Sequence, residues 1–320
     1  MMAYLLLIGC GAGAVSGLLF ASLATGSMPG VLLYLLAPLP LLLAGLGWGS
    51  LSGAAAALTA TVLVGILLNA KLAFLMLISV VLPAAWLGRL ALLSRRGASG
   101  EAEFYPPGRL VIWTGLIGAG LACAMLLYAN LADLALKAAI QEQITQILNA
   151  VIAASPSGQA PDAAQVKALA GRLSVLVLPG WAQLWMIAML INLWAAGRIL
   201  RIAGQLRRNW PDIPALDFPA RYHFVLPAAM ALAFVPGLMG DMALPVAATG
   251  LMAYGLMGLA IMHQISRYRD SRPFILTGIY TAIFLLSWPL LILAVIAMGE
   301  PVFKLRARLA RPENPPDSGT

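Results

Sequence analysis

Polar side chains that could bind a small molecule gather near the ends of the apolar stretches of this 320-residue sequence. An ionisable residue at membrane depth is a candidate functional residue, and indole rings can stack on a flat ligand. The candidates that we assign to the outer side are Asn69, Lys71, Asn130, Asp133, Trp181, Gln183, Trp185 and Asp241. We expect Lys71 to face Asp133 or Asp241 at the mouth of a pocket. Each residue by itself is also explained as a loop residue or an interfacial anchor.

Motifs for catalysis, metal binding or cofactor binding are absent from the sequence. It contains no phosphate-binding G-x-x-x-x-G-K-S/T loop, no H-E-x-x-H or C-x-x-C motif, and no G-x-S-x-G nucleophile elbow. The only histidines, His223 and His263, lie near the inner ends of apolar stretches, where an interfacial polar residue is the simpler explanation. We expect no enzyme, no metal and no cofactor. Any active transport would therefore draw its energy from a partner or an ion gradient.

The elements that must position these side chains are membrane helices. Hydrophobic residues make up 61% of the chain and charged residues 10%, with a mean hydropathy of +0.90, whereas soluble domains are about 25% charged. The alternating pattern of barrel strands is absent. The predicted fold class is all-α, a polytopic bundle of about eight to nine helices, each of about 20 residues. The apolar stretches are 4–24, 31–48, 51–68, 72–93, 109–129, 174–197, 223–240, 243–265 and 274–299.

The positive charge predicts the orientation of this single membrane domain (1–320). The formal charge is +8, and the basic residues collect in the loops after the fourth, sixth and eighth stretches. The positive-inside rule places these loops and the N-terminus in the cytoplasm, and we expect the charge to contact anionic lipid rather than nucleic acid. A ninth full crossing would export the basic tail 300–320. Because Trp288 and Pro289 interrupt the last stretch, a broken or re-entrant helix would keep the tail inside.

The segment 130–172 separates the first five stretches from the remaining ones (174–299). Its apolar residues recur at helical spacing opposite polar ones, which predicts an amphipathic helix. A turn at 155–158 and a capping-box pattern at Asp162 and Gln165 predict a second helix. The segment is thus expected to form an extracytoplasmic helical hairpin, which caps the bundle, lies on the outer leaflet or moves as a lid.

Small residues and prolines mark two of the first stretches (4–93). A small-residue stripe, which lets another helix approach closely, is formed by Gly9, Gly13, Gly17 and Ala21. The partner helix belongs either to the same bundle or to another protein. In the second stretch, Pro38 and Pro40 must break the helical hydrogen bonds and expose carbonyl groups inside the protein.

Three stretches resemble the YybS-like family of bacterial membrane proteins, a group of unknown function. They are Leu36-Ala-Pro-Leu-Pro through Gly49, the end of the fourth stretch with Arg95-Arg96, and Trp288-Pro289 followed by 299–308. The resemblance implies a distant similarity to the S components of energy-coupling-factor vitamin transporters. In that group a small-residue stripe docks onto a transmembrane coupling subunit driven by two ATPases, and the ligand binds toward the outer face. The stripe that starts at Gly9 matches in kind, although this chain has about nine stretches where that group has six.

Two functional hypotheses follow. The leading one is a subunit of the bacterial inner membrane that binds or transports a small molecule, has no energy source of its own and docks onto a coupling subunit through the stripe. The alternative is a scaffold or assembly factor for envelope proteins, whose outer hairpin binds another protein. Membrane lipid is a partner in both hypotheses.

Overall fold

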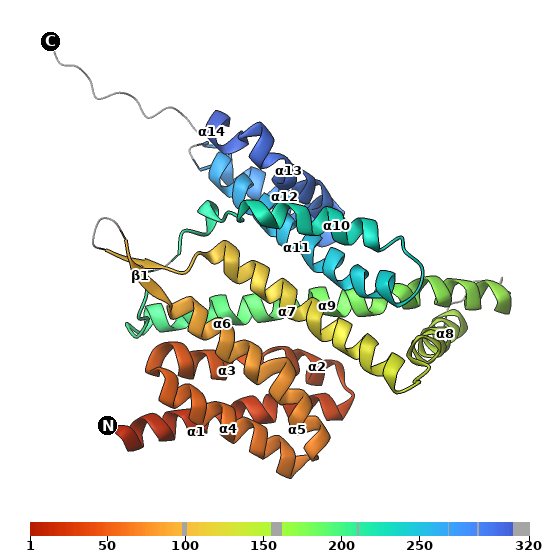
Figure 1. Cartoon of the computed structure of the whole chain (residues 1–320), viewed down its shortest axis with the longest axis horizontal. Helices are drawn as coiled ribbons and strands as arrows, with labels where there is room; N and C mark the ends of the chain where they lie inside the picture. Colours follow the sequence, from red (N-terminus) through yellow and green to blue (C-terminus); the bar gives the residue numbers. More distant parts are fainter. Residues whose placement is uncertain (98–100, 155–161, 210, 268, 287, 310–320) are drawn as a thin grey trace.

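The computed structural model describes residues 1–97, 101–154, 162–209, 211–267, 269–286 and 288–309, and these are almost entirely helical (Figure 1). The elements of the first third are α1 (Met2–Ala21), η1 (Ser22–Thr25), α2 (Met28–Leu35), α3 (Pro38–Leu43), η2 (Ala44–Trp48), α4 (Ser50–Leu67), α5 (Ala70–Met76), η3 (Leu77–Val81) and α6 (Leu82–Leu92). Those of the middle are β1 (Ser94–Arg96), β2 (Ala102–Phe104), α7 (Pro107–Leu131), α8 (Leu136–Ala154) and α9 (Ala163–Ile202). The rest are η4 (Ile213–Ala215), η5 (Ala220–Phe224), α10 (Val225–Leu232), α11 (Leu238–Ile265), α12 (Arg272–Leu286), α13 (Pro289–Phe303) and α14 (Leu305–Leu309).

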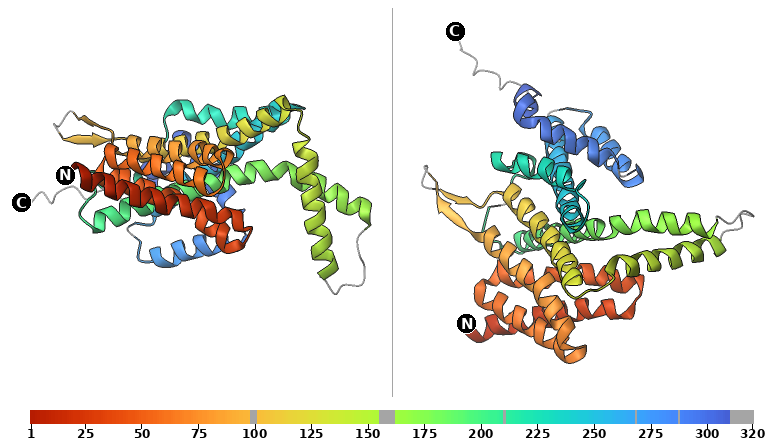
Figure 2. Two further views of the ribbon diagram at one scale, coloured as in Figure 1. Left: turned by 90° about the horizontal axis from the view of Figure 1, so that it is seen from below. Right: turned by 45° about the vertical axis from the view of Figure 1, so that its right-hand side comes forward.

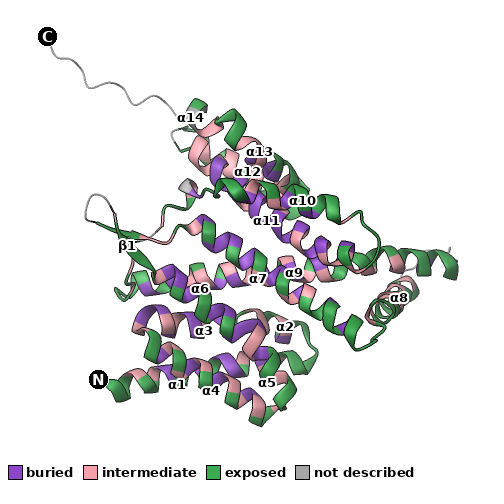
Figure 3. Cartoon of the chain, in the orientation of Figure 1, coloured by how far each residue is buried: buried purple, intermediate pink, exposed green. Residues whose placement is uncertain are grey.

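The predicted all-α membrane fold is confirmed, with fewer complete crossings than the nine stretches indicated. Among the described residues, seven helical segments are long and apolar enough to cross a membrane, and α12 and α13 are shorter apolar helices. The seven segments are Met2–Thr25, Met28–Trp48, Ser50–Leu67, Ala70–Leu92, Pro107–Leu131, Ala163–Ile202 and Leu238–Ile265. Buried residues gather on the inward faces of α7, α9 and α11, whereas α8 and α12 have none (Figure 3).

The predicted crossing at 223–240 is wrong. Only the eight-residue helix α10 forms there, and it ends at Leu232. Pro236 has no N–H with which to continue a helix, and Gly237 adopts a left-handed backbone with φ of 88°. The chain therefore turns before Leu238 and continues as α11, against which α10 packs.

The last apolar stretch forms a helical hairpin instead of one crossing. Its helices α12 and α13 have 15 residues each, or about 22 Å at 1.5 Å per residue, which is less than the hydrocarbon thickness of about 30 Å. α13 runs parallel to the second half of α11, because Gly255 lies against Leu290 and Gly258 lies against Leu293. Since α12 follows α11 directly, it must run back along the bundle before Pro289 begins α13. The broken final helix that Trp288 and Pro289 indicated is therefore present.

Three segments that carry arginines meet at one end of the bundle, which we call the basic end (Figure 1). They are the β1–β2 hairpin, the loop 203–219 and α14. Arg208 Nη1 donates to the carbonyl oxygen of Ala91 at 2.7 Å, and Arg306 Nη2 donates to the carbonyl oxygen of Leu216 at 2.7 Å. The beginning of the C-terminal tail thus lies beside the loop that follows α9, and the N-terminus lies at the same end. The tail beyond residue 309, with Arg311, lies outside the described residues.

The helix α8 and the first part of α9 project from the opposite end of the bundle as a helical pair, as predicted for 130–172 (Figure 2). The turn expected at 155–158 lies outside the described residues. α8 packs on the first part of α9, where Gln141 Nε2 donates to the carbonyl oxygen of Lys167 at 3.3 Å. The helix α9 begins directly after Asp162 and runs for 40 residues, about 60 Å. The second helix of the hairpin and the sixth apolar stretch are therefore one continuous helix, because the single Pro179 interrupts only one hydrogen bond. This helix is about twice as long as a bilayer core.

The small-residue stripe of α1 packs within the bundle. α1 makes its most extensive contact with α4, and Gly9, Gly13 and Gly17 are buried there. A Cβ atom added to Gly9 would lie 2.5 Å from the carbonyl oxygen of Ser52, and one added to Gly13 would meet that of Ala56. The two helices run parallel and touch through their backbones. Of the two partners that the sequence left open, the structure has the intramolecular one, so docking of another protein through Gly9, Gly13, Gly17 and Ala21 is not supported.

Replacing Gly13 by Leu should destabilise the fold by at least about 1–3 kcal/mol, the usual range for overpacking. The matched control is Gly11→Leu on the same helix, because an added Cβ at Gly11 meets nothing within 4 Å. Thermal unfolding of both variants in detergent measures the difference. Equal melting temperatures for Gly13→Leu and wild type would contradict this packing.

Reporters fused to the two termini should appear on the same side of the membrane, because Met1 and the last described helix, α14, both lie at the basic end. By the positive-inside rule this side is the cytoplasm. Fluorescent-protein fusions to either terminus should therefore fluoresce, and alkaline phosphatase fusions should be inactive. Active phosphatase at the C-terminus alone would require a complete crossing by the last apolar stretch.

Candidate functional site

The outer polar residues do not form the predicted pocket. Asn69 is the N-cap of α5, since its side-chain oxygen accepts the N–H of Leu72 at 2.9 Å. Lys71, Asn130 and Asp133 are exposed. Asn69 and Lys71 lie together at the start of α5, whereas Asn130 and Asp133 lie at the end of α7 and directly after it. The four residues therefore form two separate pairs at helix ends.

Asp241 has an ion-pair partner that the sequence did not indicate. Its carboxylate pairs with the ammonium of Lys137, whereas the sequence predicted that Lys71 would face either Asp133 or Asp241. Lys137 lies in the first turn of α8 and Asp241 in the first turn of α11. A carboxylate is also favoured at the N-terminus of a helix by the helix dipole. The pair therefore ties the projecting hairpin to the bundle, and periodicity could not reveal it because it depends on how the chain turns after α7.

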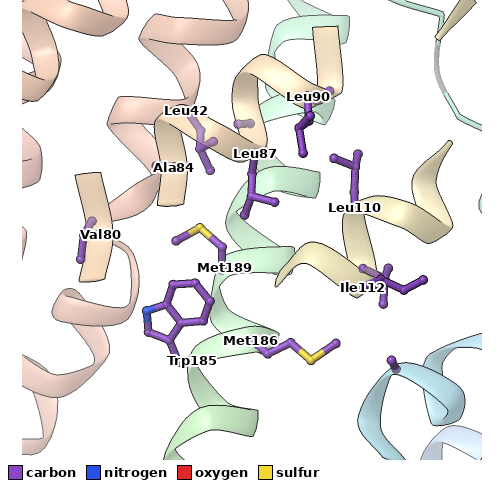
Figure 4. Packing of buried hydrophobic residues seen from close by; sticks show 14 of the residues in the cluster. Leu42, Val80, Ala84, Leu87, Leu90, Leu110, Ile112, Trp185, Met186 and Met189 are labelled. Atoms are coloured by element: carbon purple, nitrogen blue, oxygen red, sulfur yellow. The ribbon is translucent and has the colours of Figure 1, made fainter. Parts of the chain in front are cut away.

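Trp185 and Gln183 point into the protein and donate hydrogen bonds to backbone carbonyl groups. The Trp185 side chain is 6% exposed, and its Nε1 donates to the carbonyl oxygen of Ser79 at 2.9 Å. In a regular helix this carbonyl would accept the N–H of residue 83, but Pro83 has none. Gln183 Nε2 donates to the carbonyl oxygen of Ala248 at 2.8 Å. Figure 4 shows Trp185 on the face of α9 that points toward Val80.

Asn192 has the same role two turns further along α9. Pro40 has no N–H for the carbonyl of Leu36, which instead accepts the N–H of Leu39 at 3.0 Å. Because the N–H of Leu39 is used in this way, the carbonyl of Leu35 lacks its usual helical donor. Asn192 Nδ2 donates to this carbonyl at 2.8 Å instead. The exposed carbonyl predicted from Pro38 and Pro40 is thus present, and it is bonded within the protein rather than lining a ligand site. Trp181 is half-buried against the same core.

A cavity lies in the half of the bundle nearest the basic end. Its volume is about 660 Å³, within the range of small-molecule sites. It lies where α7, α9 and α11 meet the loop 203–219 (Figure 1). The lining residues are mostly apolar and come from seven segments: Leu46, Ala91, Pro107, Leu110, Val111, Leu190, Ile191, Leu193, Trp194, Gly197, Leu206, Arg208, Pro211, Ile213, Pro214, Leu216, Leu256, Leu259, Ala260, His263 and Tyr280.

The polar groups of the cavity are few. His263 Nε2 and the Tyr280 hydroxyl share a hydrogen bond of 2.9 Å between α11 and α12. Arg208 is half-buried, and its Cζ lies 5.3 Å from the centre of the Phe104 ring. Burial lowers the pKa of the Arg208 guanidinium, although an arginine stays charged in proteins. The arrangement can bind an apolar body and orient one polar group.

Sequence reasoning missed this cavity because its lining carries almost no polar signal. The prolines of the loop 203–219 are a local indication of irregular backbone, but the burial of Arg208 is visible only in the structure. The basic stretch 198–208 was assigned to lipid anchorage. Among the described residues no group of three or more His, Cys, Asp or Glu side chains lies close enough to hold a metal ion.

Within the described part of the chain, seven long apolar helical segments, several shorter apolar helices and a mostly apolar cavity define a polytopic α-helical membrane protein. The chain belongs to the family of predicted membrane proteins designated DUF2232, which it matches over residues 14–300. This agrees with the membrane-protein family expected from the sequence. No curated protein matches the chain, and no solved structure matches it. The similarity to S components therefore rests on the sequence resemblance alone.

Replacing Trp185 by Phe should destabilise the protein by about 1–3 kcal/mol, because the buried Ser79 carbonyl loses its donor. Trp181→Phe is the matched control, since Trp181 lies one turn away and is only half-buried. Unfolding in detergent measures both variants. A loss from Trp181→Phe as large as that from Trp185→Phe would assign the effect to ring size rather than to the hydrogen bond.

Proposed function

We propose that this chain is a membrane-embedded subunit that binds a small molecule with an apolar body and has no energy source of its own. The observation that supports this proposal is the cavity of about 660 Å³ beside α9. Apolar cavities of this size with a few convergent polar groups are the usual form of small-molecule sites. The proposed site lies near the basic end, whereas the outer polar residues were the candidates from the sequence.

The proposed orientation follows from charge. The basic end carries the β1–β2 hairpin, the loop 203–219 and α14, so the positive-inside rule assigns it to the cytoplasm of the bacterial inner membrane. The cavity then opens in the cytoplasmic half of the membrane, and the α8 hairpin lies outside the cell. Coupling to ATPases would need a docking surface other than the stripe on α1, because α4 covers that stripe.

A second candidate is a scaffold for envelope proteins, and the projecting hairpin favours it. α8 has no buried residue among its 19, and its side chains Ile147 and Val151 are more than half exposed. Such a face suits a protein partner or the outer leaflet. In that case a chain without residues 131–171 should lose a stoichiometric envelope partner, while no small molecule copurifies with the wild type.

Filling the cavity should remove the bound molecule. Leu259 lines the cavity, and Leu259→Trp would occupy its free volume. The matched control is Leu58→Trp on α4, where the side chain is 68% exposed and away from the cavity. Mass spectrometry of organic extracts from the purified proteins should find a near-stoichiometric compound in wild type and Leu58→Trp, and at least about fivefold less in Leu259→Trp.

Both variants must keep the melting temperature of the wild type for the comparison to be valid. The same compound at equal amounts in all three proteins would place it outside the cavity and contradict the proposal. Mass spectrometry of copurifying proteins in the same preparations separates the two candidates, because a coupling membrane subunit with ATPases supports transport and envelope-assembly proteins support the scaffold.

A further inference from the structure

The cavity has one permanently charged group, and that group has no counter-ion. Arg208 donates to two backbone carbonyl oxygens, from Nη1 to Ala91 at 2.7 Å and from Nε to Asn209 at 3.3 Å. Among the described residues no carboxylate lies within ion-pair distance of its guanidinium. Arginine has five N–H groups, so at least three remain for another acceptor. A half-buried charge without a counter-ion is unfavourable, and an anion at this position would relieve it.

The rest of the lining complements an anion with an apolar body. None of the lining residues is Asp or Glu, and apart from Arg208 the side chains that can hydrogen-bond are Trp194, His263 and Tyr280. Leucines of α9 and α11 and the prolines of the loop 203–219 supply most of the remaining surface. A ligand whose anionic group reaches Arg208 would therefore place its apolar portion among these side chains.

The cavity is open toward the lipid-facing surface of α9. Ile191 and Trp194 line it, and their side chains are 54% and 52% exposed. Both lie in the apolar part of α9 that is long enough to cross the membrane. Tyr280 contributes from α12, a helix without buried residues that lies apart from the main bundle (Figure 2). An amphiphile can thus enter sideways from the bilayer leaflet at the basic end.

We propose that the cavity binds an anionic amphiphile from this leaflet, with its head group on the Arg208 guanidinium and its apolar chain along α9 and α11. Guanidinium groups bind phosphate and carboxylate oxygens through paired hydrogen bonds. The inference deepens the proposed function, because it rests on ligand binding in this cavity and names the chemical class of the ligand.

The test compares two probes that share one chain and differ in charge, hexadecyl phosphate and hexadecanol. Scintillation proximity measures binding of each tritiated probe to the purified full-length protein in neutral detergent. Binding to Leu259→Trp, whose cavity is filled, is subtracted as micelle background. The expected result is that wild type binds the phosphate about tenfold more tightly than the alcohol, as one charge-assisted interaction provides.

Arg208→Gln should reduce the affinity for hexadecyl phosphate to that for hexadecanol and leave the affinity for hexadecanol unchanged. Arg207→Gln is the matched control, because Arg207 is the exposed neighbour and does not line the cavity. It should bind both probes as wild type does. A loss of affinity for both probes in Arg208→Gln would assign Arg208 to structure and overturn the inference.

The two proposals fail in different ways. Equal affinity of wild type for the phosphate and the alcohol overturns the anionic ligand but keeps the cavity as a binding site. If Leu259→Trp binds both probes as well as wild type does, the cavity is not the binding site and the proposed function is overturned as well. Arg207→Gln could abolish the preference for the phosphate while Arg208→Gln keeps it. That result would place the anion site on the outer surface of the basic end and would likewise overturn the inference.

Discussion

Every backbone carbonyl inside a membrane needs a hydrogen-bond donor, because lipid supplies none. This chain breaks its helices with prolines and must therefore replace the donors that it loses. α9 provides several of them: Trp185 donates to the Ser79 carbonyl and Asn192 to the Leu35 carbonyl. These side chains hold the broken α2–α3 and α5–α6 segments against one central helix. The positions of α2–α3 and α5–α6 against α9 depend on these two hydrogen bonds.

Helix breaks also make the C-terminal part of the chain differ from the N-terminal part in the length of its helices. The helices α10, α12 and α13 are each too short to cross a bilayer. α10 and α13 pack beside α11, whereas α12 packs against α13. Full-length helices close the interior by direct packing, as α1 and α4 do where the glycines of α1 lie against the backbone of α4. Tyr280 of the short helix α12 lines the space beside α9 and α11, which side chains leave unfilled. The cavity lies at this place, next to the loop 203–219.

The two ends of the molecule have different chemistry. At the basic end, arginines bond to carbonyl groups at helix and loop ends, as Arg208 does with Ala91 and Arg306 with Leu216. At the opposite end, the ion pair of Lys137 and Asp241 joins the projecting hairpin to α11. Charge excess and an open apolar cavity thus coincide at one end, which favours an anionic amphiphile over the polar ligand that the outer residues indicated. The hairpin remains a separate surface at the other end.

The amino-acid sequence by itself determined the class of protein, because hydropathy and charge are local properties. It predicted an all-α membrane bundle, the amphipathic hairpin, the carbonyl exposed by Pro38 and Pro40, and the interruption at Trp288 and Pro289. It also found the small-residue stripe, but only the tertiary structure decided that α4 covers it. The cavity, the partner of Asp241 and the inward orientation of Trp185 likewise depended on the tertiary structure. Each depends on which distant segments meet, and helical periodicity shows that a face is covered without showing which segment covers it.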